Sequence, residues 1–146
     1  MNCYRTKKMV GYEENVIVSF DGNRWYKLSA TMDTGNSGMY PTVGAVINEE
    51  ANGYVKFVVQ ADYTSNGIHE ECLNVEGTIT PKVGKEKVTR PVVKCAYIKI
   101  GNKELKNTYV AIADRSFKNT KALINRNLMT ELKLMVDPSV KYELGK

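Results

Sequence analysis

The sequence predicts a mostly β protein, a small closed β-barrel with one short helix late in the chain. Runs rich in Val, Ile, Tyr and Thr alternate with polar residues, which is typical of strands with one buried face. Turns that contain Gly or Asn separate these runs, as in hairpins. The 146 residues contain no repeat, linker or low-complexity tract. We therefore expect a single domain that spans residues 1–146.

The first half of the chain predicts two hairpins. Residues 16–20 and 25–32 are strand-like runs on either side of the turn Asp21-Gly22-Asn23. Residues 43–47 and 54–59 form the next pair, separated by a polar turn. Residues 62–72 contain Ser65-Asn66-Gly67 and few core-type side chains, so they predict a long exposed loop.

The second half predicts a further hairpin and then the helix. A short strand at 73–80 ends at Pro81, and Gly101-Asn102 joins the long strands 88–100 and 104–113. The apolar run 122–124 precedes a helix at 125–132, for which Asn125 or Asn127 could be the N-cap. Residues 133–136 predict a last strand, with Asp137-Pro138 as a terminal turn.

One tripeptide has the pattern of a catalytic site. Asp33-Thr34-Gly35 follows directly on the strand 25–32, so a carboxylate lies where an apolar strand gives way to a turn. Gly35 would let the chain double back tightly, and Thr34 could bond to the backbone. The same tripeptide is also compatible with an ordinary hairpin turn.

Composition limits the other function classes. The formal charge of +5 is spread along the chain, so no basic footprint for nucleic acid is evident, although acidic partners are favoured. No apolar run predicts a membrane span or a signal peptide, so we expect a cytoplasmic protein. Three cysteines without a close pair predict reduced thiols. One histidine cannot complete a zinc site, although His69 and Cys72 have ligand-like spacing, so we expect no metal.

The chain resembles the retropepsins, the single-domain aspartic proteases. The narrower resemblance is to the bacterial and phage retropepsin-like family named ATP-dependent zinc proteases. Five short motifs carry this resemblance in the family's order: Asp33-Thr34-Gly35, Arg90-Pro91-Val92-Val93, Ala113-Asp114-Arg115-Ser116, Leu123-Ile124-Asn125-Arg126 and Val136-Asp137-Pro138-Ser139. In the family, the segment that corresponds to residues 123–126 packs beside the catalytic loop and leads into a short helix.

The resemblance implies peptide-bond hydrolysis by a homodimer. One Asp-Thr-Gly per chain is half of an aspartic protease site, so Asp33 of each subunit would meet at a two-fold axis. The resemblance assigns Asp33, Thr34 and Gly35 to the catalytic loop. A pair of carboxylates that shares one proton activates water and needs no cofactor.

The arginines in the family motifs are candidates for substrate binding. Arg90, Arg115 and Arg126 could bind carboxylates in bidentate fashion, and the family's association with glutamate tails implies an acidic peptide or protein substrate. The alternative is a structural Arg–Asp pair, such as Arg126 with Asp114, that fixes the late helix.

The chain departs from the family pattern at two places. Residues 36–42 replace the family's Ala and Thr-Ser continuation, and Asn125 stands where glycine is usual. Because Asn also tolerates the left-handed region, the second change is mild for the backbone. The alternative function is therefore an inactive structural or assembly component with assembly partners, for example of a virus particle, located in the host cytoplasm or the virion.

Overall fold

A computed structural model describes residues 7–83 and 86–146, and it shows a β-barrel that six strands close, with one short helix. Strands account for 59% of the residues and helix for 4%, so the predicted fold class is confirmed. The strands of the first half are β1 (Lys8–Ser19), β2 (Tyr26–Met32), β3 (Thr42–Ala51), β4 (Tyr54–Val59), β5 (Tyr63–Thr64), β6 (Glu70–Asn74) and β7 (Gly77–Ile79). The remaining elements are β8 (Lys82–Val83), β9 (Glu86–Lys87), β10 (Arg90–Ile100), β11 (Lys103–Ala113), β12 (Ala122–Ile124), α1 (Arg126–Glu131) and β13 (Leu134–Lys141).

The barrel closes because β11 pairs with β3. The order around it is β11-β10-β1-β2-β12-β3, and the parallel β11–β3 pairing completes the ring. Aliphatic side chains such as Val16, Leu28 and Ile98 fill the interior, each fully buried or nearly so. Burial of each such side chain contributes roughly 1.5–3 kcal/mol to folding, so the closed sheet is itself the source of the core.

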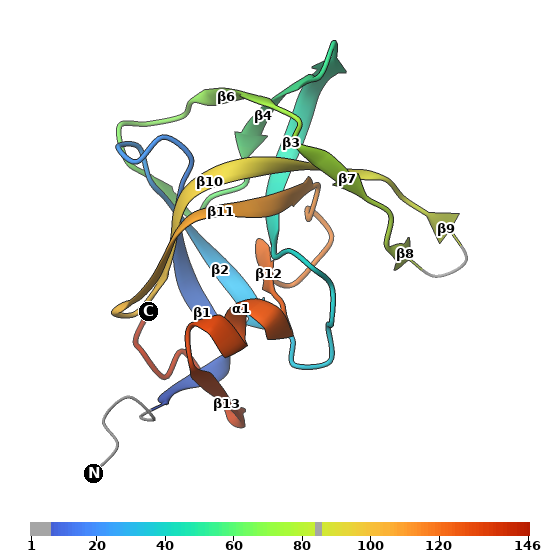
Figure 1. Cartoon of the computed structure of the whole chain (residues 1–146). Helices are drawn as coiled ribbons and strands as arrows, with labels where there is room; N and C mark the ends of the chain where they lie inside the picture. The colour runs from blue at the N-terminus through green and yellow to red at the C-terminus, as the bar shows by residue number, and fades with distance from the viewer. Residues whose placement is uncertain (1–6, 84–85) are drawn as a thin grey trace.

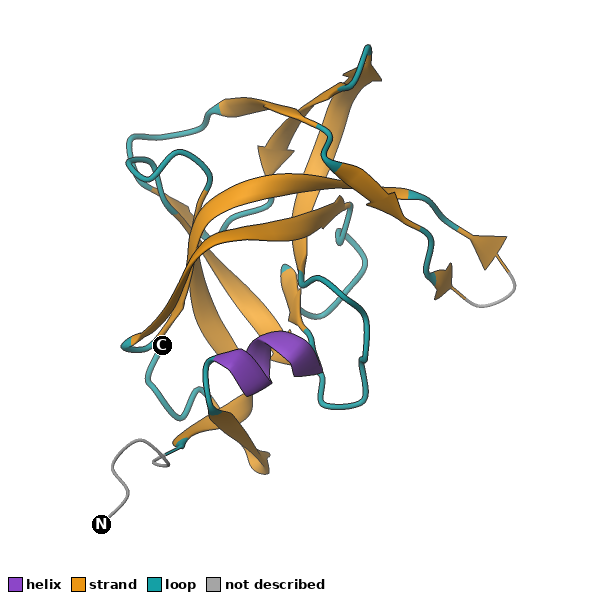
Figure 2. Cartoon of the chain, viewed as in Figure 1, coloured by secondary structure: helices purple, strands orange, loops and turns teal. Residues whose placement is uncertain are grey.

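The short strand β12 lies between two strands that follow one another in sequence. It runs parallel to β2 and antiparallel to β3, with Ile124 opposite Met32 and Leu123 opposite Thr42. The loop of residues 33–41, which joins β2 to β3, therefore passes around the end of β12 where α1 begins (Figure 1). Figure 2 shows the helix α1 beside that loop.

Three sequence-based expectations about the elements are wrong. The first strand begins at Lys8, well before residue 16, and the expected loop 62–72 contains β5 and the start of β6. The last strand does not end in a turn at Asp137-Pro138 but continues to Lys141, with a register shift in its pairing with β1. A proline is tolerated there because a bulge leaves its position outside the regular ladder.

Candidate functional site

Asp33 lies at the junction between β2 and the loop 33–41, as expected. Its backbone N–H donates to the carbonyl of Ile124 at 3.0 Å, which continues the β2–β12 pairing by one residue. Met32 before it is buried in the core, and Asp33 itself is half-buried. The expected adjacency of Asp33 to residues 123–127 is confirmed.

The loop turns immediately after Asp33. The N–H of Asn36 donates to the Asp33 carbonyl at 3.1 Å, and the N–H of Gly35 donates to Asp33 Oδ1 at 3.2 Å. Thr34 and Gly35 are exposed. Gly35 has no positive φ, and an added Cβ would lie at an ordinary 3.5 Å from Asp33 Oδ1. The chain does turn at Gly35, but the turn makes no use of the conformational freedom of glycine, and the lack of a side chain there leaves the Asp33 carboxylate accessible.

Asn125 fastens the far side of the loop. It is fully buried, its Oδ1 accepts from the N–H of Leu128 at 3.3 Å as the N-cap of α1, and its Nδ2 donates to the carbonyl of Gly38 at 2.5 Å. Its φ of −86° is ordinary extended backbone. Asn125 is thus suited to this position because its amide bonds in two directions, and tolerance of the left-handed region plays no part.

Arg126 is the arginine that the structure brings to the loop. Its backbone N–H donates to the carbonyl of Asn36 at 2.9 Å, and its side chain is exposed. The alternative pairing with Asp114 is wrong. The Asp114 carboxylate instead accepts from the hydroxyl of Ser116 at 2.5 Å, from the N–H of Ser116 at 2.8 Å and from Gln60 Nε2 at 2.7 Å, and these bonds lower the pKa of Asp114.

Arg90 and Arg115 lie elsewhere, at the end of the β10–β11 ladder. Arg115 is 8% exposed and donates from Nε to the carbonyl of Thr120 at 3.0 Å. The hydroxyl of Thr120 shares a 2.7 Å hydrogen bond with the hydroxyl of Thr31, two residues before Asp33. Arg115 is therefore joined through Thr120 to the strand that delivers Asp33, although it is not part of the loop.

A small pocket lies against the loop, and apolar side chains make up part of its wall beside polar ones such as Asn127 and Glu131. It has a volume of about 160 Å³, and its wall includes Met39, Tyr40, Leu105, Tyr109 and Leu128. The rings of Tyr40 and Tyr109 are 6.1 Å apart, and Met39 is 68% exposed. A dry cavity of about 150 Å³ can hold benzene, so this pocket has the volume for one large apolar side chain. The signal available in the sequence was Met39-Tyr40, two large side chains in an otherwise polar loop.

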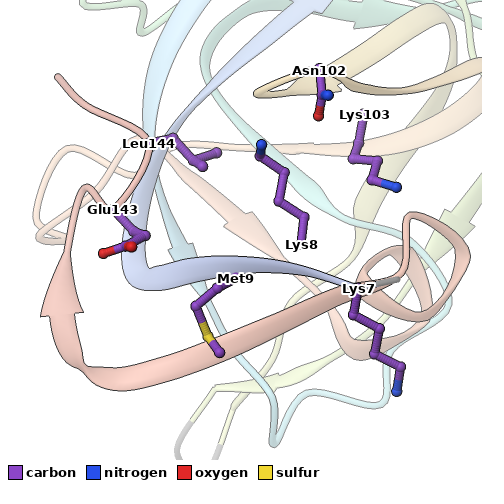
Figure 3. A pocket seen from close by; sticks show the side chains of 7 residues that line it. All are labelled: Lys7, Lys8, Met9, Asn102, Lys103, Glu143 and Leu144. Carbon is purple, nitrogen blue, oxygen red and sulfur yellow. The ribbon is translucent and has the colours of Figure 1, made fainter. Parts of the chain in front are cut away.

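A larger hollow at the β10–β11 hairpin is basic. It has a volume of about 490 Å³ and is lined by Lys7, Lys8, Lys103 and Glu143 among others. Figure 3 shows that the lysine amino groups do not converge, since that of Lys7 points away from those of Lys8 and Lys103. Solvated lysines that point apart do not by themselves make a binding site, and we assign none there.

The cysteines and the histidine do not gather. Within residues 7–83 and 86–146, no three His, Cys, Asp or Glu side chains are placed to hold a metal ion. His69 and Cys72 are exposed, and Cys95 is buried, where desolvation raises the pKa of its thiol to about 12. Cys3 lies outside the described residues. None of the helices found in the described part of the chain is long and apolar enough to span a membrane.

Comparison with known proteins gives one informative structural likeness. The sequence matches no protein-family model, and no curated protein matches it. A solved structure of a protein of unknown function (DUF785) from Legionella pneumophila subsp. pneumophila str. Philadelphia 1 superposes with a TM-score of 0.67. The two chains are 25% identical, and the match covers 94% of this chain and 98% of the other. The likeness supports the barrel over nearly the whole chain, and its name states no activity.

Proposed function

We propose that this protein is an aspartic peptidase that acts as a homodimer. The observation that carries the proposal is the setting of Asp33: a half-buried carboxylate at the end of a core strand, fixed by its own N–H to Ile124 and followed by the exposed residues Thr34 and Gly35. A group held rigidly by its backbone, with its side chain accessible, meets the geometric requirement of acid–base catalysis. The resemblance to the retropepsins supports the same assignment.

The chemistry needs a second copy of the chain. Two Asp33 carboxylates at a two-fold axis cannot both ionise when they lie about 3 Å apart, so the pair shares one proton. The ionised member takes a proton from a bound water as that water attacks the peptide carbonyl. The protonated member stabilises the developing oxyanion and then helps the amine to leave.

Thr34 and Gly35 fit supporting roles at such an interface. Among the described residues the Thr34 hydroxyl has no hydrogen-bond partner, and it is exposed, so it is free to bond across a two-fold axis. The absence of a side chain at Gly35 leaves room beside Asp33 Oδ1. We therefore expect Thr34→Ala to weaken dimerisation, measured by analytical ultracentrifugation, whereas an unchanged dimer constant would remove Thr34 from the interface.

An acidic peptide is the substrate class that we propose. Arg126 is exposed where it meets the loop at Asn36, and the chain carries a formal charge of +5. A guanidinium in that position can bind a substrate carboxylate in bidentate fashion. The pocket beside Met39 would accept a neighbouring apolar side chain of the same peptide.

A second candidate function is that of a catalytically inactive assembly component, located in the host cytoplasm or within a virion. Its support is the exposure of large apolar side chains: Phe117 is fully exposed, Ile68 is 91% exposed, and Met39 lies in the altered loop. Exposed apolar side chains that are grouped on one face mark sites of protein association. On this alternative these exposed side chains would contact assembly partners, and Asp33 would have only a structural role.

The test compares wild type with Asp33→Asn on glutamate-rich peptides and on a protein library. Asn is near-isosteric and keeps the loop's hydrogen bonds, but it cannot share the proton of the pair, so cleavage should fall at least ~10²–10⁴-fold. Asp137→Asn, which changes a carboxylate on β13 that accepts from Ser139, is the matched control and should retain full activity. Equal turnover by both Asp33 forms would exclude the aspartic mechanism, and no turnover by wild type would favour the assembly component.

The pH dependence provides an independent check. Only the singly protonated pair is active, so the rate should follow a bell-shaped profile whose two limbs belong to the pair rather than to either residue. A rate that keeps rising through neutral pH would instead indicate a single general base.

A further inference from the structure

Arg90 and Arg115 leave the barrel at the same end of one ladder. Arg90 is the first residue of β10, and Arg115 lies two residues beyond the end of β11. Val92 pairs with Ala111 in antiparallel register, so the start of β10 lies beside the end of β11, as Figure 1 shows. Burial lowers the pKa of the Arg115 guanidinium, and the positive charge of Arg90 lowers it further, as expected of two neighbouring cations.

Neither arginine has a counter-charge in the described part of the chain. Arg115 donates only to neutral acceptors, the carbonyl of Thr120 and, at 3.4 Å from Nη2, its hydroxyl. Arg90 Nε is buried and has no hydrogen-bond partner at all. The ion pairs found among residues 7–83 and 86–146 join Lys56 to Glu49, Lys94 to Glu76 and Lys141 to Glu13.

Two neighbouring, partly desolvated cations without an anion are unfavourable. Burying a charge costs several kcal/mol unless an opposite charge and hydrogen bonds compensate it. Asp114, next to Arg115 in sequence, does not compensate here, because its exposed carboxylate is engaged by Gln60 and Ser116. An anion placed between the two guanidiniums would relieve both the repulsion and the unsatisfied Nε.

The arginine side chains are also able to receive such an anion. Arg90 is half-buried rather than enclosed, and because its Nε makes no hydrogen bond, the guanidinium can turn toward a ligand without breaking one. Thr120 holds Arg115 on one side and leaves it further N–H donors. Two planar forks match the oxygens of a carboxylate or a phosphate.

We propose that Arg90 and Arg115 form an oxyanion-binding site, which takes a carboxylate or phosphate group. The site differs from the Asp33 loop in its residues and its strands, and it does not require Asp33 to be catalytic. Through Thr120 and Thr31, however, the site is linked to the strand that precedes Asp33. A bound anion would therefore be connected by hydrogen bonds to a residue two positions before Asp33.

The experiment is titration calorimetry on the full chain with inorganic phosphate and, separately, with glutarate, at an ionic strength held constant with chloride. Loss of a charge-assisted hydrogen-bond pair is worth at least about 1.5 kcal/mol, so Arg90→Met should weaken binding by about 10-fold or more. Arg24→Met is the matched control, because it removes an arginine whose guanidinium lies against the carbonyls of Ser65, Asn66 and Gly67, and it should change affinity less than about 2-fold. Asp33→Asn should bind as wild type does, which separates this site from the proposed peptidase.

The outcomes are distinct. Binding of either anion supports the site. Binding of phosphate alone would identify the ligand group as a phosphate, and binding of glutarate alone would identify it as a carboxylate. No binding of either anion beyond chloride overturns the proposal, as does an equal loss of affinity in Arg24→Met, which would indicate attraction to overall charge.

Nuclear magnetic resonance observes the two arginines directly, and its wild-type titration covers the case in which a variant fails to fold. The arginine Nε–Hε signals in a proton–nitrogen correlation spectrum should include two that move when the anion is added to wild type. One of these signals should be missing from the spectrum of Arg90→Met and the other from that of Arg115→Lys. Movement of neither signal would overturn the proposal.

Discussion

The loop 33–41 and the Arg90–Arg115 pair differ in how their polar groups are satisfied. In the loop, the amide of Asn125 bonds to Leu128 and Gly38, and the N–H groups of Asp33 and Arg126 reach Ile124 and Asn36. At the arginines, one buried Nε has no partner and two positive charges have no anion among the residues that the structure describes.

The difference separates a region whose buried polar groups are all paired within the chain from one whose buried polar groups are not. Buried polar groups in native proteins are nearly always hydrogen-bonded, so a fully satisfied network needs no role beyond stabilising the fold. Buried polar groups without a partner need a further explanation, and a ligand that binds to them is one such explanation. The chain alone therefore holds Asp33 in place, whereas the proposed oxyanion would supply the hydrogen-bond acceptor and the counter-charge for the two arginines.

The largest expected effect is on the satisfied side. Asn125→Ala removes the N-cap and leaves the Gly38 carbonyl with only the longer bond from Asn127, so the free energy of unfolding should fall by about 2–4 kcal/mol. Urea denaturation measures this. Asn127→Ala, which removes an exposed and longer bond to the same carbonyl, should cost less than about 0.5 kcal/mol. Similar losses in the two variants would contradict the role of Asn125 as the fastening residue.

The next effect concerns the link between the two regions. Thr120→Val keeps the shape of a side chain that is 1% exposed but removes the hydroxyl that bonds Thr31 and Ala122. The loss in unfolding free energy should be about 1–3 kcal/mol. The control is Thr130→Val, where the lost hydroxyl only bonds back to the carbonyl of Arg126 on an exposed helix face. If both variants lose the same stability, Thr120 does not join the regions.

The unsatisfied side should respond in the opposite direction. Arg90→Met removes a half-buried charge that has no partner, and the thioether side chain fills similar space. In anion-free buffer the protein should be unchanged or more stable by up to about 1 kcal/mol in urea. A loss of more than about 1 kcal/mol would mean that Arg90 already has a stabilising partner.

The smallest effect is the acid dependence of Asp114. Bonds from Ser116 and Gln60 lower its pKa from the ordinary 3.8, so its contribution is present above that pH and is lost as the pH falls through the lowered value. Because the carboxylate is exposed, Asp114→Asn should cost below about 1 kcal/mol at pH 7, and the difference from wild type should vanish in strong acid. Urea curves at the two pH values measure it, and a difference that grows in acid would reverse the sign.

The sequence predicted the elements whose signals are local. The alternation of residues 25–32 ends at a carboxylate and a turn, and the structure places Asp33 there. β6 was missed because Glu70, Glu71 and Cys72 look like a polar loop. Glu71 is nevertheless buried, since it accepts a hydrogen bond from the hydroxyl of Tyr26, and that partner is 45 residues away.

The insertion of β12 between β2 and β3 could not be predicted from local pattern either. Three residues, Ala122–Ile124, carry no register information, and their pairing depends on strands far away in sequence. The expectation that this segment lies beside Asp33 came from the resemblance to the retropepsins. The orphaned Nε of Arg90 has no sequence signal at all, because it depends on which acceptors are absent around it.

The central claim is that one chain presents half of a catalytic pair, and the arrangement of Asp33 in the assembled protein tests it most directly. A crystal structure of the homodimer, grown with a non-cleavable acidic peptide, should place the two Asp33 carboxylates within about 3 Å of each other across a two-fold axis. The peptide carbonyl should lie over the pair. A monomer at concentrations where peptides are cleaved, or a dimer in which the two carboxylates lie far apart, would contradict the account.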